Sequence, residues 1–172
     1  RIYTPVLMDA TASPEYMEAQ DRILKLQGVP ISEIREKLEG LTASAFFAKK
    51  EAVLDWISEF LETGEKLVLM GWHVAVLDFL EAHFGRSCVR VSGGVSKERK
   101  EAAVHRFQTD AGCKVFLGQT VSAGVGIDGL QEVCSNMAFV ELCWSWADVD
   151  QATSRLHRMG QQGAVNVYYL VL

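Results

Sequence analysis

Short apolar runs alternate with longer amphipathic segments from residue 66 to the end of the chain. Runs rich in Val, Leu and Met are typical of strands buried on both faces, as in parallel sheets covered by helices. Each intervening segment is long enough for a right-handed crossover. The predicted strands are residues 66–70, 88–92, 114–117, 137–142 and 165–171, and the predicted helices are 74–84, 96–109 and 148–159. The pattern therefore predicts an α/β fold with helices on both faces of a parallel sheet.

The segment before residue 66 is expected to be helical. Ser13 and Pro14 form an N-cap and first-turn pair, whereas Gly40 and Gly64 are typical helix stops. The predicted helices span residues 14–27, 31–41 and 43–63. We expect two units, a helical linker or extension over residues 1–41 and the sheet-bearing lobe over 42–172. Whether the first unit packs on the second is left open.

Overall charge and hydropathy limit the possible functions. The net charge is −5 with only 17 Lys and Arg residues, so any contact with phosphate must be local. No apolar run reaches the roughly 18 residues of a membrane span, and we expect an intracellular protein without a membrane partner. In a bacterium or virus it would lie in the cytoplasm or nucleoid, and in a eukaryote in the nucleus.

The cysteines and histidines do not predict a metal site. Four cysteines lie far apart without a C-x-x-C pair, which argues against zinc and against a disulfide framework. They are expected to be small buried apolar residues. The histidines His73, His83 and His105 are expected at the surface or hydrogen-bonded.

A glycine-rich loop follows the strand predicted at residues 114–117. It contains Thr120, Gly124, Gly126 and Asp128. Backbone N–H groups and a hydroxyl at the end of a strand can bind a phosphate, while an aspartate can accept a hydrogen bond from a sugar hydroxyl. An ordinary glycine-rich turn explains the glycines equally well.

A second polar cluster follows the strand predicted at residues 137–142. On a helix, Gln151, Arg155 and Arg158 would project from one face, because they are spaced by four and three residues. Two guanidinium groups near a strand end suit the recognition of phosphate oxygens. The alternative is a solvated helix face, with Asp148 or Asp150 paired to an arginine.

Several of these segments resemble conserved helicase motifs. The run Q-A-T-S-R-L-H-R-M-G-Q at residues 151–161 resembles the sixth motif in its Swi/Snf form, and residues 120–128 resemble the fifth motif. Residues 66–78 are similar to the fourth motif, and residues 139–144 are most similar to the annealing-helicase branch. From about Leu41 to its end, the chain resembles the C-terminal lobe of a Swi/Snf-type, superfamily-two DNA-dependent ATPase.

The resemblance implies a RecA-like fold and a role for individual residues. Arg155 and Arg158 would be arginine fingers, with Arg158 at the γ-phosphate of ATP, Arg155 bridging to the neighbouring motif and Gln151 orienting both. The nucleotide would be bound by Gly124, Gly126 and Asp128. Nucleic-acid phosphates would contact Thr120, Gly94, Ser96, Lys97 and Arg99. For Lys97 and Arg99, a helix N-terminus with ordinary surface charges is an equally good explanation.

The resemblance also implies what the lobe works with. ATP with Mg²⁺ would be the cofactor, held mainly by an N-terminal RecA-like lobe of the same protein, and duplex DNA would be the substrate. This sequence has no G-x-x-x-x-G-K-[ST] phosphate loop, so the chain alone is expected not to hydrolyse ATP. Two alternatives remain, a lobe of a strand-separating DNA or RNA helicase and a non-catalytic interaction module with the helicase fold.

Overall fold

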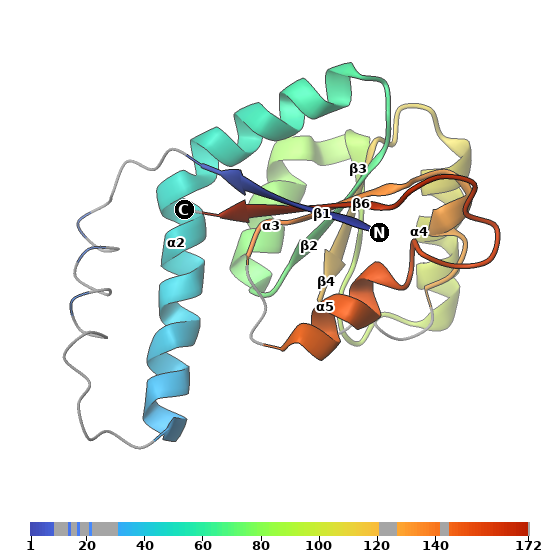
Figure 1. Cartoon of the computed structure of the whole chain (residues 1–172). Coiled ribbons are helices and arrows are strands. Elements are labelled where there is room, and N and C mark those ends of the chain that lie inside the picture. Colours follow the sequence, from blue (N-terminus) through green and yellow to red (C-terminus); the bar gives the residue numbers. More distant parts are fainter. Residues whose placement is uncertain are drawn as a thin grey trace.

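A six-stranded parallel sheet forms the centre of the protein (Figure 1). The computed structural model describes residues 1–8, 14, 17, 21, 31–120, 127–141 and 145–171. Strand order is β1-β6-β5-β2-β4-β3, and every pair of neighbours is parallel. The strands are β1 Ile2–Leu7, β2 Leu67–Gly71, β3 Cys88–Val91, β4 Val115–Gln119, β5 Asn136–Phe139 and β6 Asn166–Val171. The predicted α/β fold with a parallel sheet is therefore confirmed.

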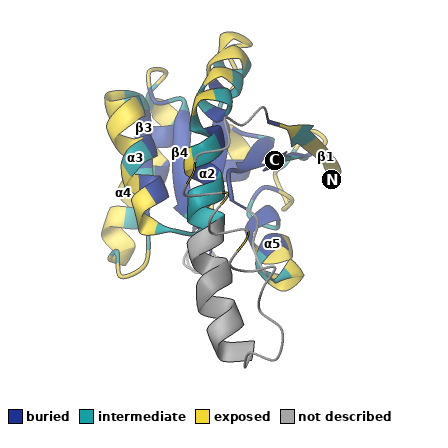
Figure 2. Cartoon of the chain, turned by 90° about the vertical axis from the view of Figure 1, so that its left-hand side faces the viewer, coloured by how far each residue is buried: buried dark blue, intermediate teal, exposed yellow. Residues whose placement is uncertain are grey.

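Helices cover both faces of the sheet, as the strand sequences require. The helices are α2 Ile31–Glu62, α3 Val74–Phe84, α4 Lys97–Thr109 and α5 Trp146–Thr153, with short 3₁₀ turns η1 Gly85–Ser87 and η2 Leu130–Glu132. Along β2, Leu67 and Leu69 pack with α2 and α3, whereas Val68 and Met70 pack with α4 and α5. This alternation buries the central strands between two helical layers, whereas β1 at the edge is largely exposed (Figure 2).

Packing between aromatic rings fixes α4 on the sheet. Phe107 of α4 and Phe116 of β4 are fully buried, and their ring centroids lie 5.5 Å apart at an interplanar angle of 68°. Such an edge-to-face pair contributes about 0.5–1.5 kcal/mol beyond the apolar area it buries. Because α4 is held in this way, its first turn stays at the carboxyl edge of the sheet.

Three elements differ from the sequence-based prediction. Gly40 does not end a helix, because α2 runs without a break from Ile31 to Glu62. The strand β1 was not predicted, and it pairs with β6 at the edge of the sheet. The helix predicted over residues 148–159 ends at Thr153. There the hydroxyls of Thr153 and Ser154 donate to the carbonyl of Asp150, at 3.1 and 2.7 Å, and compete with the helical hydrogen bonds.

Other predictions fall partly outside the described residues. The helix predicted over residues 14–27 is described only at Pro14, Met17 and Asp21. The boundary at residue 41 stays a prediction, and α2 crosses it. Among the described cysteines, Cys88, Cys113 and Cys134 are free and buried; Cys143 lies outside the described residues. No helix in the described part of the chain combines the length and apolar character needed to cross a membrane.

Candidate functional site

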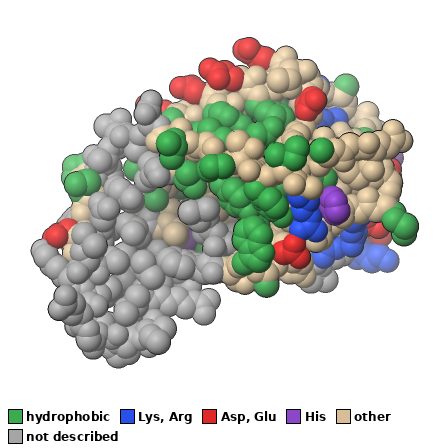
Figure 3. Space-filling model, in the orientation of Figure 1, with side chains coloured by type: hydrophobic (Ala, Val, Ile, Leu, Met, Phe, Trp, Pro, Cys, Tyr) green, Lys and Arg blue, Asp and Glu red, His purple; other side chains and the backbone are tan. Residues whose placement is uncertain are grey.

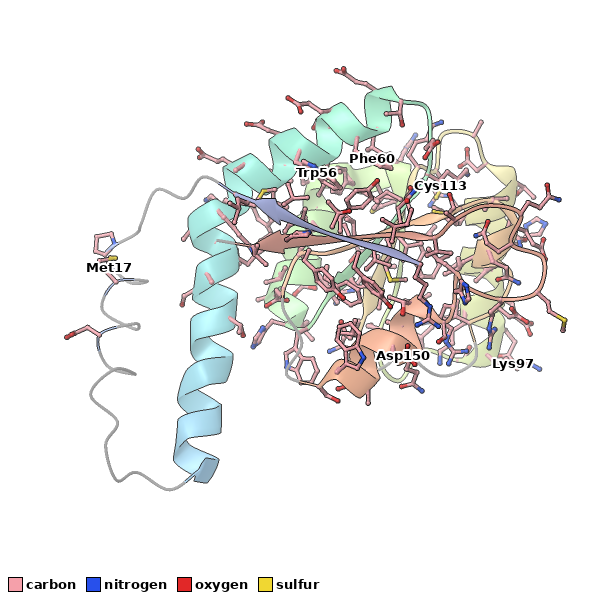
Figure 4. All side chains as sticks on the ribbon, in the orientation of Figure 1. Met17, Trp56, Phe60, Lys97, Cys113 and Asp150 are labelled. Carbon is pink, nitrogen blue, oxygen red and sulfur yellow. The ribbon has the colours of Figure 1, made fainter. Side chains whose placement is uncertain are left out.

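The carboxyl ends of the parallel strands share one edge of the sheet. The segments that follow β2, β3, β4 and β5 leave the sheet there, whereas the turn after α5 lies beside residues 131–134, which precede β5. In Figure 4, Lys97 at the start of α4 and Asp150 on α5 lie on the same lower side of the molecule. Ligands of open α/β sheets bind beyond this edge. Residues that bind a ligand are therefore expected along this edge.

Asp128 is the centre of a hydrogen-bonded cluster. Its carboxylate accepts from the side-chain amide of Gln131 at 3.2 Å, the backbone N–H of Gly129 at 3.0 Å and Nη1 of Arg158 at 2.9 Å. These donors, the Gln131 amide foremost, lower the pKa of Asp128 below its usual value. Asp128 is therefore an anion at neutral pH, and it holds Arg158 in place.

The two predicted arginines do not share a helical face. They lie in the irregular turns after α5, where the N–H of Arg155 donates to the carbonyl of Ala152 at 3.0 Å and that of Arg158 to Leu156 at 3.1 Å. The prediction of one helical face was wrong, because α5 ends before either arginine. Gln151 lies exposed in the last turn of α5.

The turn still brings the two guanidinium groups together. Burial lowers the pKa of Arg155, and the positive charge of Arg158 lowers it further. Among the described side chains, Nε of Arg155 is one of the few buried nitrogens without a hydrogen-bond partner. Asp150 pairs with Arg1 instead of either arginine. The two arginines thus form a positive centre beside Asp128, in which Nε of Arg155 is shielded from solvent.

The ion pair between Arg158 and Asp128 is weak enough to be exchanged. The Arg158 side chain is 36% exposed and the Asp128 side chain 75% exposed. Ion pairs so open to water contribute about 0.2–1 kcal/mol. A polyphosphate, which carries more charge than one carboxylate, can therefore compete for Arg158.

A hollow of about 380 Å³ beside Asp128 does not suit an anion. It lies between α4 and the loop before η2. Three carboxylates line it, from Glu101, Asp128 and Glu132. Their charge disfavours a phosphate group in this hollow.

The turn between β3 and α4 brings four of the predicted nucleic-acid residues together. Gly94 has φ +78°, and Ser96 caps α4 by accepting from the N–H of Arg99 at 3.4 Å. Lys97 is 82% exposed and lies 3.7 Å from the carboxylate of Glu101. The geometry fits both an anion-binding helix N-terminus and an ordinary charged one.

Thr120 is not at the surface. It is 1% exposed, and its hydroxyl and N–H both donate to the carbonyl of Gly71, at 3.1 and 2.9 Å. The remaining predicted nucleotide residues, Gly124 and Gly126, lie outside the described residues. The structure thus places Thr120 in the interior, where it joins the end of β4 to the end of β2.

Glu141, which the sequence-based prediction did not include, lies at the carboxyl edge just after β5. It is 2% exposed, and its carboxylate accepts from the N–H groups of Trp72 and His73 at 2.7 and 3.0 Å. The other carboxylate oxygen lies 2.5 Å from Nδ1 of His73. An acidic residue directly after an apolar strand was the available signal. Within the described part of the chain, no group of three His, Cys, Asp or Glu side chains could hold a metal ion.

Charged side chains are segregated on the surface. In Figure 3, Lys and Arg side chains gather at the lower right, whereas Asp and Glu side chains lie along the upper edge, where α2 runs. A protein of net charge −5 thereby presents a local positive area. Such an area raises the local concentration of anions.

Comparisons with known proteins show what the chain is similar to. Residues 48–160 match the family model described as helicase conserved C-terminal domain. A SWI/SNF-related matrix-associated actin-dependent regulator of chromatin, subfamily A-like protein 1, from Xenopus tropicalis is 33% identical in a 129-residue alignment that covers 72% of this chain and 13% of that protein. The human DNA annealing helicase and endonuclease ZRANB3 is 29% identical in a 175-residue alignment that covers 97% of this chain and 16% of that protein.

Solved structures with the same fold are ATPase cores. The Sulfolobus solfataricus SWI2/SNF2 ATPase core domain superposes with a TM-score of 0.75 at 19% identity, over 98% of this chain and 39% of that chain. The C-terminal part of the Fun30 ATPase domain superposes with a TM-score of 0.62 at 20% identity, over 98% of this chain and 64% of that chain. At these identities the likeness concerns the fold.

Proposed function

The chain belongs to the helicase conserved C-terminal domain family, in its Swi/Snf-type form, and on this premise we propose that it is the second motor lobe of an ATP-dependent DNA translocase. It spans only 13–16% of the length of the relatives described above. The activity proposed here is therefore that of a longer protein, to which this lobe contributes part of the active site.

The observation that carries the proposal is the arginine pair beside Asp128. Arg155 has an unused buried donor, and Arg158 is held by an exposed ion pair that a polyphosphate can replace. In this assignment Arg158 contacts the γ-phosphate, and Arg155 bridges to the loop that carries Asp128. Gln151 orients the two arginines. Arginine fingers elsewhere accelerate phosphoryl transfer by about 10³–10⁵-fold, because they neutralise charge that develops in the transition state.

Asp128 has two roles in this assignment. Before nucleotide binds, it fixes the position of Arg158 at 2.9 Å. Afterwards its carboxylate, whose lowered pKa keeps it ionised, accepts a hydrogen bond from the ribose. Gly124 and Gly126 would bring the backbone close to the same nucleotide. When bound, ATP would supply the phosphoanhydride that is cleaved and Mg²⁺ would neutralise charge on its phosphates, with the first lobe holding most of both.

The nucleic-acid contacts are assigned to the first turn of α4 and the loop before it. Backbone N–H groups at a helix N-terminus attract phosphate, and Lys97 and Arg99 add positive charge there. Gly94 and Ser96 shape this turn. Thr120 is assigned to the same edge, where its hydroxyl donates to the carbonyl of Gly71 at the end of β2. Duplex DNA is the proposed substrate.

The proposal is tested by ATP turnover of the full-length protein with and without duplex DNA. We expect turnover to rise when duplex DNA is added, and we expect no turnover from the 172-residue chain alone. Displacement of a third strand from a triplex, without separation of a forked duplex, would identify a translocase. Separation of the fork would favour a strand-separating helicase. Absence of turnover under all conditions would refute the proposal and favour an interaction module.

A further inference from the structure

A row of hydrogen bonds joins the carboxyl ends of β5, β2, β4 and β3, which are neighbours in the sheet. After β5, Glu141 accepts from the N–H groups of Trp72 and His73, at 2.7 and 3.0 Å. At the end of β4, Gln119 donates its side-chain amide to the carbonyl of Trp72 at 3.2 Å. Its side-chain oxygen accepts from the N–H of Gly93 at 3.2 Å. One row thus runs from the loop after β5 to the loop after β3.

The backbone of Trp72 is the middle of this row. Glu141 holds its N–H on one side, and Gln119 holds its carbonyl on the other. The Glu141 side chain is fully buried, and its contacts to two backbone N–H groups and to Nδ1 of His73 occupy both carboxylate oxygens. Hydrogen bonds to a buried carboxylate are stronger than those between neutral groups. The hydrogen bonds of Glu141 are therefore the strongest in the row, and those of Gln119 are weaker.

Gln119 carries the restraint to the loop after β3. That loop contains the adjacent glycines Gly93 and Gly94, and Gly94 has a positive φ of 78°. Glycines lose more backbone freedom than other residues when they are ordered. An outside contact must therefore hold this loop in one conformation, and the hydrogen bond from the N–H of Gly93 to Gln119 is such a contact.

We propose that Gln119 is a positioning residue for nucleic-acid binding, which holds the Gly93–Gly94 loop ready for phosphate and is itself anchored through Trp72 by Glu141. This inference rests on the proposed function, because it assumes that the loop before α4 contacts the nucleic acid. A loop ordered before binding does not lose that conformational entropy on binding, so the row raises affinity without touching the DNA.

The test uses Gln119→Leu in the full-length protein. Leucine has a similar volume and removes both hydrogen bonds. We expect the duplex DNA concentration that gives half-maximal ATP turnover to rise about fivefold. This is the effect of losing one neutral hydrogen bond, because only the bond to Gly93 holds the loop directly. The maximal rate at saturating DNA should change by less than about twofold, because the lost interaction acts before the chemical step.

Asn166→Leu is the matched control. Asn166 donates its side-chain amide to Asn136 at 3.0 Å, at the opposite, amino-terminal edge of the sheet. This variant also loses a side-chain amide hydrogen bond of the sheet, but it should leave the half-activating DNA concentration unchanged. A double-mutant cycle then combines Gln119→Leu with Glu141→Gln. Both residues act through Trp72. The double variant should therefore raise the half-activating DNA concentration by a smaller factor than the product of the two single-variant factors.

Each outcome decides the inference. An unchanged half-activating concentration in Gln119→Leu, with DNA still stimulating the wild type, overturns the positioning role alone. The positioning role is also overturned if Gln119→Leu lowers the thermal midpoint and the maximal rate together with the response to DNA, because that result indicates a general structural role. If the effects of the two variants multiply fully, Glu141 does not act on Gln119 through Trp72. If Glu141→Gln does not fold, Gln119→Leu and its control decide the positioning role. A wild type that DNA does not stimulate refutes the proposed function, and the inference with it.

Discussion

Replacing Gly129 by alanine tests whether the loop beside Asp128 is held as the structure shows. Gly129 has φ +96°, in the left-handed region, which costs other residues about 1–2 kcal/mol. A Cβ at this position would lie 2.6 Å from Nε2 of Gln108. That nitrogen is the end of a flexible side chain, so it can swing away. In doing so it would lose its hydrogen bonds to the carbonyl of Gly129, at 2.9 Å, and to Glu132, at 3.2 Å.

The expected cost follows from these two contributions. Backbone strain of about 1 kcal/mol and about 1 kcal/mol for the lost hydrogen bonds give about 2 kcal/mol less free energy of unfolding for Gly129→Ala. Gly64→Ala is the matched control, because Gly64 has φ +83° and no atom within 4 Å of a built Cβ. It should lose about 1 kcal/mol through strain alone.

Urea unfolding of the 172-residue chain measures both free energies. In a Gln108→Ala background, Gly129→Ala should cost no more than Gly64→Ala, because the hydrogen bonds are already absent. If Gly129→Ala and Gly64→Ala cost the same in the wild-type background, the reasoning about Gln108 is refuted.

Two further predictions concern buried titratable groups. Burial lowers the pKa of Lys49 from 10.5 to about 8, so between those pH values the unfolded chain binds a proton that the folded chain does not. The free energy of unfolding should therefore rise with pH across this window, by up to about 3 kcal/mol. In urea titrations, the free energy of unfolding of Lys49→Met should not show that rise. An identical pH dependence in the wild type and Lys49→Met would contradict the prediction. Burial raises the pKa of the Cys134 thiol to about 12, so at pH 8 iodoacetamide should modify Cys134 only as fast as the protein unfolds. Peptide mass spectrometry would measure this, and rapid labelling of the folded protein would show that the thiol is accessible.

The central part of the fold was predictable because its signals are local. The apolar runs of β2 and β4 are buried on both faces, and α3 spans the predicted residues 74–84. The strand β1 was missed because its sequence contains Pro5 and is largely exposed. Proline is tolerated at a sheet edge, and β1 exists only through its pairing with β6, more than 150 residues away.

Helix ends were harder to predict, since tertiary contacts and side-chain hydrogen bonds decide them. A single glycine costs a helix about 1 kcal/mol, and the 32-residue helix α2 tolerates Gly40. Conversely, the spacing of Arg155 and Arg158 favoured a helix that the hydroxyls of Thr153 and Ser154 help to end at residue 153.

The candidate site was predictable in its residue types but not in its internal contacts. The sequence predicts that Asp128 and Arg158 belong to one site, and their contact at 2.9 Å agrees with this. The sequence pattern did not predict that Glu141 accepts a hydrogen bond from the backbone of Trp72, because every residue type except proline has the same backbone N–H group. Hydrogen bonds of this kind depend on strand order, which emerges only in the folded sheet.

The central claim is that Arg155 and Arg158 complete a nucleotide site whose other half lies on the first lobe. Its most direct test is Arg158→Ala in the full-length protein, with ATP turnover at saturating duplex DNA measured beside the dissociation constant for ATP. The exposed Arg86, in η1 before β3, provides the control Arg86→Ala.

The account predicts that Arg158→Ala lowers turnover by about 10³-fold or more, as for other arginine fingers, while ATP still binds and Arg86→Ala turns over normally. Turnover of Arg158→Ala equal to that of Arg86→Ala would contradict it.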